Sequence, residues 1–135
     1  MSSFWESSSL DKDHFIEKNG MRYAGTHLII DLWEAIHLDN LEIMKNALHE
    51  CVIACKATLL HLHLHRFEPN GGISGIAILA ESHISMHSWP EKKYAAIDLF
   101  MCGNCQPFLS LPILKKIFQP KYISLNEQMR GILHE

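Results

Sequence analysis

The chain has 135 residues, the length of one compact domain, and 47% of them are hydrophobic against 20% charged. That balance excludes a disordered protein, and a formal net charge of −3 offers no basic surface for nucleic acid or an anionic membrane. No apolar run approaches the roughly 18 residues of a membrane span, and residues 1–13 lack the apolar stretch of a signal peptide. We therefore expect a cytoplasmic protein.

Residues 1–24 are predicted to be a flexible N-terminal extension, because they are rich in serine and show no sustained periodicity. A single domain, residues 25–135, follows. Strand patterns in this domain cover residues 26–32, 58–67, 73–80, 83–89, 94–101 and, as a short last strand, 122–125.

Two helices are predicted between these strands. Asn40 offers an N-cap for the first helix, and Pro107 suits the first position of the second. Each helix has an apolar face at helical spacing: Leu41, Met44, Leu48, Cys51 and Cys55 in the first, and Phe108, Leu111, Leu114 and Phe118 in the second.

The order of these elements, β-α-β-β-β-α-β, predicts an α+β fold. Hairpin-spaced strands favour a two-layer sandwich with a mostly antiparallel sheet and the two helices on one face. The other face of so small a sheet would be left exposed, which favours a contact with a second subunit.

Histidines and cysteines leave a metal- or thiol-binding protein open as an alternative. His61, His63 and His65 alternate, so they share one face of a strand and either bind a metal or form a polar subunit surface. Cys102 and Cys105 form a C-x-x-C pattern, which alone suggests zinc or redox chemistry. No matching second pair accompanies it, because the other two cysteines have helical spacing and are expected to be buried free thiols.

The segment 81–91, ESHISMHSWPE, is the most unusual part of the chain. It places serine hydroxyls beside the imidazoles of His83 and His87, a combination that suggests nucleophilic chemistry. No G-x-S-x-G motif accompanies it, so a hydrolase of that type is not supported. On the residues alone, the segment is either a candidate site or a polar hairpin.

This segment, followed by YAAIDLFMCG at 94–103, resembles the signature of prokaryotic S-adenosylmethionine decarboxylases. Residues 25–29 and 67–75 and the closing Arg130-Gly131 are similar to that family as well, so the resemblance covers about residues 25–131. It implies an inactive proenzyme that cleaves itself between Glu81 and Ser82 into chains 1–81 and 82–135.

The resemblance also implies the parts that individual residues play in processing and catalysis. Ser82 becomes a pyruvoyl group, which forms a Schiff base with the substrate amine and acts as the electron sink, with no external cofactor. His87 assists the cleavage after Glu81 as a base, and Ser74 supports it. Cys102 donates a proton to the product carbon.

Other matching residues imply the substrate and the assembly. Glu91 accepts hydrogen bonds from ribose hydroxyls, Phe67 stacks on adenine, and Trp89 is close enough to assist. The product is decarboxylated S-adenosylmethionine, the aminopropyl donor for spermidine, and two processed protomers form a homodimer with shared active sites. No metal is expected. The nearest rival is the same pyruvoyl chemistry acting on arginine or ornithine.

Overall fold

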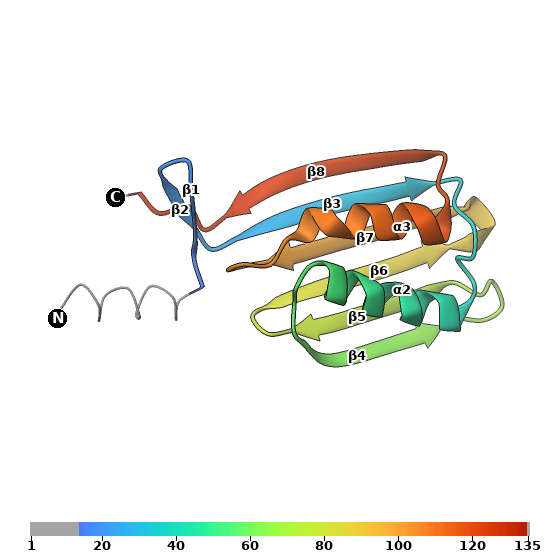
Figure 1. The fold of residues 1–135 in the computed structure, drawn as a ribbon. Coiled ribbons are helices and arrows are strands. Elements are labelled where there is room, and N and C mark those ends of the chain that lie inside the picture. The colour runs from blue at the N-terminus through green and yellow to red at the C-terminus, as the bar shows by residue number, and fades with distance from the viewer. Residues whose placement is uncertain (1–13, 135) are drawn as a thin grey trace.

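A six-stranded antiparallel sheet with two helices on one face forms the body of the protein (Figure 1). The computed structural model describes residues 14–134. The strands are β3 (Gly25–Trp33), β4 (Leu59–Arg66), β5 (Ile73–Leu79), β6 (Ser82–Trp89), β7 (Tyr94–Met101) and β8 (Tyr122–Arg130). The helices are α2 (Leu41–Ala54) and α3 (Ser110–Phe118), with short 3-10 turns at Pro90–Lys92 and Pro107–Leu109. The predicted α+β sandwich is confirmed.

The sheet order is β4-β5-β6-β7-β3-β8, so β6 and β7 lie at its centre. Side chains alternate along these strands between a buried and a less buried face, as in β7 with Ala95, Ile97 and Leu99 turned inward. Helix α2 begins where predicted, since the side chain of Asn40 accepts a hydrogen bond of 3.0 Å from the Ile43 amide.

The N-terminal extension contains a hairpin that was not predicted. Strands β1 (Ile16–Lys18) and β2 (Met21–Tyr23) pair around Asn19-Gly20, whose φ angles are 53° and 79°. Asn-Gly is the favoured dipeptide for such a two-residue turn. Only part of the predicted flexible extension can be compared, because residues 1–13 lie outside the described residues.

Two other elements differ from their predicted bounds. The last strand was predicted to be short, but β8 continues to Arg130 along the whole of β3. It is an edge strand and most of its residues are exposed, so its second half is polar and shows no strand pattern. Phe108 is 41% exposed in the 3-10 turn and does not belong to the buried face of α3.

The sheet face that carries no helix exposes apolar side chains. Five of them, on β3, β5 and β6, are each 40–44% exposed: Ile29, Trp33, Ile76, Ile78 and Trp89. A face of this kind is typical of a surface that another molecule covers. Within residues 14–134, no helix is long and apolar enough to cross a membrane.

Candidate active site

Ser82 is the first residue of β6 and lies against Cys102, which follows the end of β7. Because β6 and β7 are antiparallel, these two ends of the strands meet. The Cys102 amide donates to Ser82 Oγ at 3.3 Å, and the two side-chain atoms, Oγ and Sγ, are 3.7 Å apart. The Cys102 thiol also donates to the carbonyl oxygen of Glu81 at 3.1 Å. A hydroxyl, a thiol and the carbonyl before the hydroxyl are therefore in contact.

Glu81 occupies a strained position directly before Ser82. Its φ is 61°, in the left-handed region that glycine or asparagine normally fills. Leu79 pairs with Ser82, so only Ala80 and Glu81 form the turn between β5 and β6. A non-glycine residue in this region costs about 1–3 kcal/mol. The strain lies next to the bond between Glu81 and Ser82.

Cys102 holds its proton more firmly than an ordinary thiol does. Burial raises the pKa of Cys102, the hydrogen bond with Ser82 lowers it, and the nearby charge of Glu81 raises it, with a net increase. A thiol with a raised pKa stays protonated at neutral pH and can donate that proton.

Ser74 and His87 form a second pair of candidate residues. They lie directly opposite each other on β5 and β6, on the face without helices, and Ser74 Oγ is 2.8 Å from His87 Nδ1. Together with His63, His65 and neighbouring residues they line an open pocket of about 280 Å³. Two of the three alternating histidines therefore lie beside this pair rather than in a metal cluster of their own.

The residues expected to bind substrate lie at the same end of the sheet as Ser74. Phe67 follows β4 and is 51% exposed, with its ring centroid 4.5 Å from that of His65. Trp89 ends β6 and stacks on Tyr94 at 5.3 Å. Glu91 lies in the exposed 3-10 turn that follows.

The candidate residues thus form two separate groups within one chain. His87 is five residues after Ser82 on β6, a separation of roughly 16 Å along a strand. Ser82 also faces the helix side, whereas His87 faces the opposite side. The structure does not bring His87 to Ser82 within one protomer.

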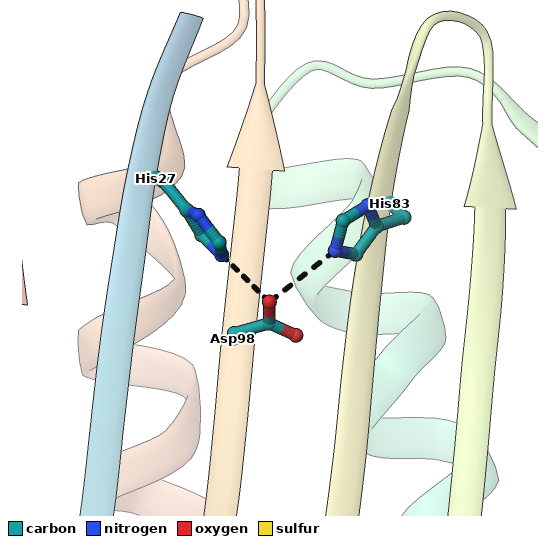
Figure 2. Close-up of side chains that lie close together, drawn as sticks. All are labelled: His27, His83 and Asp98. Atoms are coloured by element: carbon teal, nitrogen blue, oxygen red, sulfur yellow. Dashed lines mark hydrogen bonds and ion pairs between the residues drawn. The ribbon is translucent and has the colours of Figure 1, made fainter. Parts of the chain in front are cut away.

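A third group, His27, His83 and Asp98, was missed by sequence reasoning (Figure 2). One sign of this group was present in the sequence, since Asp98 is a lone charged residue at an outward position of the apolar strand 94–101. The residues come from β3, β6 and β7, so only the sheet order brings them together.

The four cysteines give no support to a thiol- or metal-binding protein. Burial raises the pKa of both Cys51 and Cys55 to about 12, as expected for inert core thiols. Cys105 donates to the Lys56 carbonyl at 3.6 Å, away from the Glu81 carbonyl that Cys102 contacts. All four are free thiols.

The open antiparallel sheet with helices on one face defines an α+β protein, and the contact of a serine, a thiol and a carbonyl at a hairpin turn is its candidate reactive site. Comparison with known proteins identifies the family within this class. The family model described as S-adenosylmethionine decarboxylase matches residues 26–131. The chain therefore belongs to the S-adenosylmethionine decarboxylase family.

Individual relatives agree with this assignment. A Thermomicrobium roseum protein named S-adenosylmethionine decarboxylase proenzyme is 40% identical over 114 residues, 84% of this chain and 98% of that protein. A Methanococcus maripaludis protein of the same name is 40% identical over 116 residues, 84% of this chain and 94% of its own length. The crystal structure of the Aquifex aeolicus adenosylmethionine decarboxylase superimposes with a TM-score of 0.75 at 30% identity, covering 84% of this chain and 95% of that one.

Proposed function

We propose that this chain is a self-processing, pyruvoyl-dependent enzyme that decarboxylates S-adenosylmethionine. The contact of the Cys102 thiol with both Ser82 Oγ and the Glu81 carbonyl oxygen is the observation that carries the proposal. The membership of the S-adenosylmethionine decarboxylase family supports the same activity.

In the proposed cleavage, Ser82 Oγ attacks the carbonyl carbon of Glu81, and an ester replaces the peptide bond. The Cys102 thiol stabilises the negative charge that develops on the carbonyl oxygen. A base then removes the α-proton of Ser82, the Cβ–Oγ bond of Ser82 breaks, and Glu81 leaves as a carboxylate that keeps this oxygen. Water converts the resulting dehydroalanine into the pyruvoyl group and ammonia. Release of the turn strain at Glu81 favours the first step.

The surroundings of Ser82 fit a pyruvoyl group. Ser82 is only 8% exposed, so the group would be shielded from bulk water, and the Cys102 thiol is beside it. A pyruvoyl group supplies a carbonyl that binds an amine and accepts electrons while CO2 leaves. Cys102, with its raised pKa, then donates its proton to the product carbon.

The base is His87, oriented by the 2.8 Å contact with Ser74, and it comes from a second copy of the chain. The separation of roughly 16 Å along β6 supports this, because it excludes a direct transfer within one protomer. A homodimer that pairs the apolar sheet faces would cover Ile29, Ile76 and Ile78. The proposal also requires this dimer to bring the Ser74 group of one chain to the start of β6 in the other, although the Ser82 hydroxyl itself faces the helices.

Mixed dimers test the shared site. Chains carrying Ser82→Ala and His87→Ala, each with a different tag, should remain uncut when expressed alone. When they are co-expressed, the His87→Ala chain should be cut, because its partner supplies the histidine, and the Ser82→Ala chain should stay whole. Cleavage of neither chain in the mixture would contradict a shared site.

The substrate is proposed from the family and from Phe67, Trp89 and Glu91, which lie near the Ser74–His87 pair at one end of the sheet. Arginine and ornithine are the alternatives, but neither has a ribose or an adenine for these residues to bind. The cleaved protein should release CO2 from S-adenosylmethionine. Release from arginine or ornithine alone would overturn the substrate and leave the cleavage intact. We expect no external cofactor and a cytoplasmic location.

A further inference from the structure

Two histidines and an aspartate meet on the sheet face without helices (Figure 2). His27 on β3 and His83 on β6 both lie opposite Phe100 of β7, and Asp98 precedes Phe100 by two residues. His27 Nε2 is 2.6 Å and His83 Nε2 is 3.3 Å from the same atom, Asp98 Oδ2. The two imidazoles therefore approach one carboxylate from both sides.

Arg130 determines where the protons of this cluster lie. A guanidinium can only donate, and Arg130 Nη1 is 3.0 Å from His27 Nδ1, so that nitrogen accepts. The proton of His27 is therefore on Nε2 and is donated to Asp98. Ser85 donates to the other carboxylate oxygen, Oδ1. Burial raises the pKa of Asp98, but hydrogen bonds from Ser85, His27 and His83 bring it below its usual value, so the carboxylate is ionised.

The cluster has the composition of a two-histidine, one-carboxylate metal site, but its surroundings argue against a metal. A metal-binding histidine donates its other N–H to an acceptor, which leaves the ligand nitrogen free of a proton. His27 has the opposite arrangement, because Nδ1 accepts from Arg130 and Nε2 carries the proton. The charge of Arg130 also repels a cation. The groups therefore serve one another as hydrogen-bond partners.

One member of the cluster, His83, lies next to the proposed cleavage point. His83 directly follows Ser82, and before cleavage the Ala80-Glu81 turn ties this end of β6 to β5. Cleavage removes that tie, and a new chain end is prone to fraying. The side chain of His83 is the first one beyond the new end. It is bound to Asp98, and its ring centroid is 6.2 Å from that of Phe100.

We propose that Asp98 is a positioning residue, which binds His83 so that the cleaved end of β6 stays in place beside Cys102. This inference rests on the proposed function, since it assumes the cut. His27, held by Arg130, fixes the carboxylate from the other side, so the hydrogen bonds join three neighbouring strands. A displacement of about 1 Å at a reacting group can lower a rate by roughly a hundredfold, and Cys102 has to reach the former Ser82.

Two substitutions at one position separate hydrogen bonding from packing. His83→Phe keeps a ring against Phe100 but removes the donor to Asp98, whereas His83→Gln keeps an N–H donor of similar reach. We expect both variants to be cut. The fraction of protein that carries a pyruvoyl group is found from the mass spectrum of chain 82–135, and kcat is expressed per pyruvoyl group. In His83→Phe we expect this kcat to fall at least tenfold, with KM changed less than threefold. His83→Gln should retain kcat within about threefold.

Asp98→Asn removes the charged acceptor and should behave as His83→Phe does. Asp31→Asn is the matched control, because Asp31 is a part-buried carboxylate on the same face, and an asparagine oxygen can still accept the hydrogen bond that the Tyr94 hydroxyl donates to it. It should leave kcat and the dimer unchanged. Hydrogen exchange gives a second measurement: amides of residues 83–86 should exchange faster in cut His83→Phe than in the cut parent, while those of 94–101 do not.

Several results would overturn this role for Asp98. It is contradicted if cut His83→Phe or cut Asp98→Asn keeps the parental kcat. It is also contradicted if His83→Gln loses as much kcat as His83→Phe, because the imidazole itself would then be needed. Failure of both His83→Phe and Asp98→Asn to be cut would place the role of the cluster before cleavage. Loss of kcat on treatment with a chelator would indicate a metal instead. If the parent chain is never cut, the proposed function is contradicted, and the role of Asp98 that rests on it is contradicted as well.

Discussion

At the scale of single residues, the proposed chemistry is concentrated where β6 begins. The sequence predicted Ser82 and Cys102 through the family resemblance, and the structure brings them into contact. The left-handed turn at Glu81 was not predicted, because a glutamate gives no sign of a positive φ. Nor was Asp98 predicted as part of a site, because its partners come from strands that are distant in sequence. The lone charge in the apolar strand 94–101 marked Asp98 itself, but nothing local in the sequence identifies the residues that it contacts.

Glu81→Gly should slow cleavage by about fivefold relative to Glu81→Ala. Glycine adopts a positive φ without cost, so about 1 kcal/mol of strain no longer favours the attack of Ser82. Alanine keeps the strain and removes the carboxylate, as glycine does, which makes it the matched control. Appearance of chain 82–135 over time measures the rate. Equal rates in the two variants would show that the turn strain has no part in cleavage.

The pH dependence of decarboxylation should report on Cys102. The thiol donates only when it is protonated, so activity is lost as the pH rises through its pKa. Because burial raises that pKa above the value of an ordinary exposed thiol, the fall in kcat should begin at a more alkaline pH than an ordinary thiol would give. In cut Cys102→Ser the remaining kcat should be low and should lack this alkaline decline. An alkaline decline unchanged in Cys102→Ser would assign it to another group.

At the scale of elements, periodicity predicted both helices and the positions of the six sheet strands, because most of these elements turn one regular face toward the core. It failed where burial is low. The second half of β8 is exposed at the sheet edge, and the hairpin of β1 and β2 is too short to show alternation. The Asn19-Gly20 dipeptide was the one local signal for that hairpin.

Asn40→Ala should lower the free energy of unfolding by about 1 kcal/mol, since the Ile43 amide loses its capping acceptor. Cleavage should still occur, because α2 lies on the sheet face opposite to His87. Chemical denaturation of the uncut Ser82→Ala background measures the difference. Asn46→Ala, inside the same helix, is the control and should not destabilise the protein. Equal effects at both positions would contradict the capping role.

At the scale of the whole molecule, the proposed dimer would explain both the exposed sheet face and the separation of the two groups of candidate residues. Ile78→Lys adds a charge to the apolar face and should give a folded monomer that is not cut. Ile53→Lys changes the same residue type on α2, where Ile53 is 76% exposed, and should remain dimeric and cleaved. Sedimentation and circular dichroism measure assembly and folding. A monomeric Ile78→Lys that is cut at the parental rate would contradict a shared site.

The proposed function depends above all on whether the chain cuts itself between Glu81 and Ser82 and converts Ser82 to a pyruvoyl group. Intact mass of the purified protein tests it most directly. We expect two chains. Residues 1–81 should end in an ordinary carboxyl group, and residues 82–135 should be blocked at the N-terminus and lighter by one ammonia than the product of simple hydrolysis. Ser82→Ala is the uncut control. If the parent chain, like this control, gives a single species with the mass of all 135 residues, self-cleavage is contradicted.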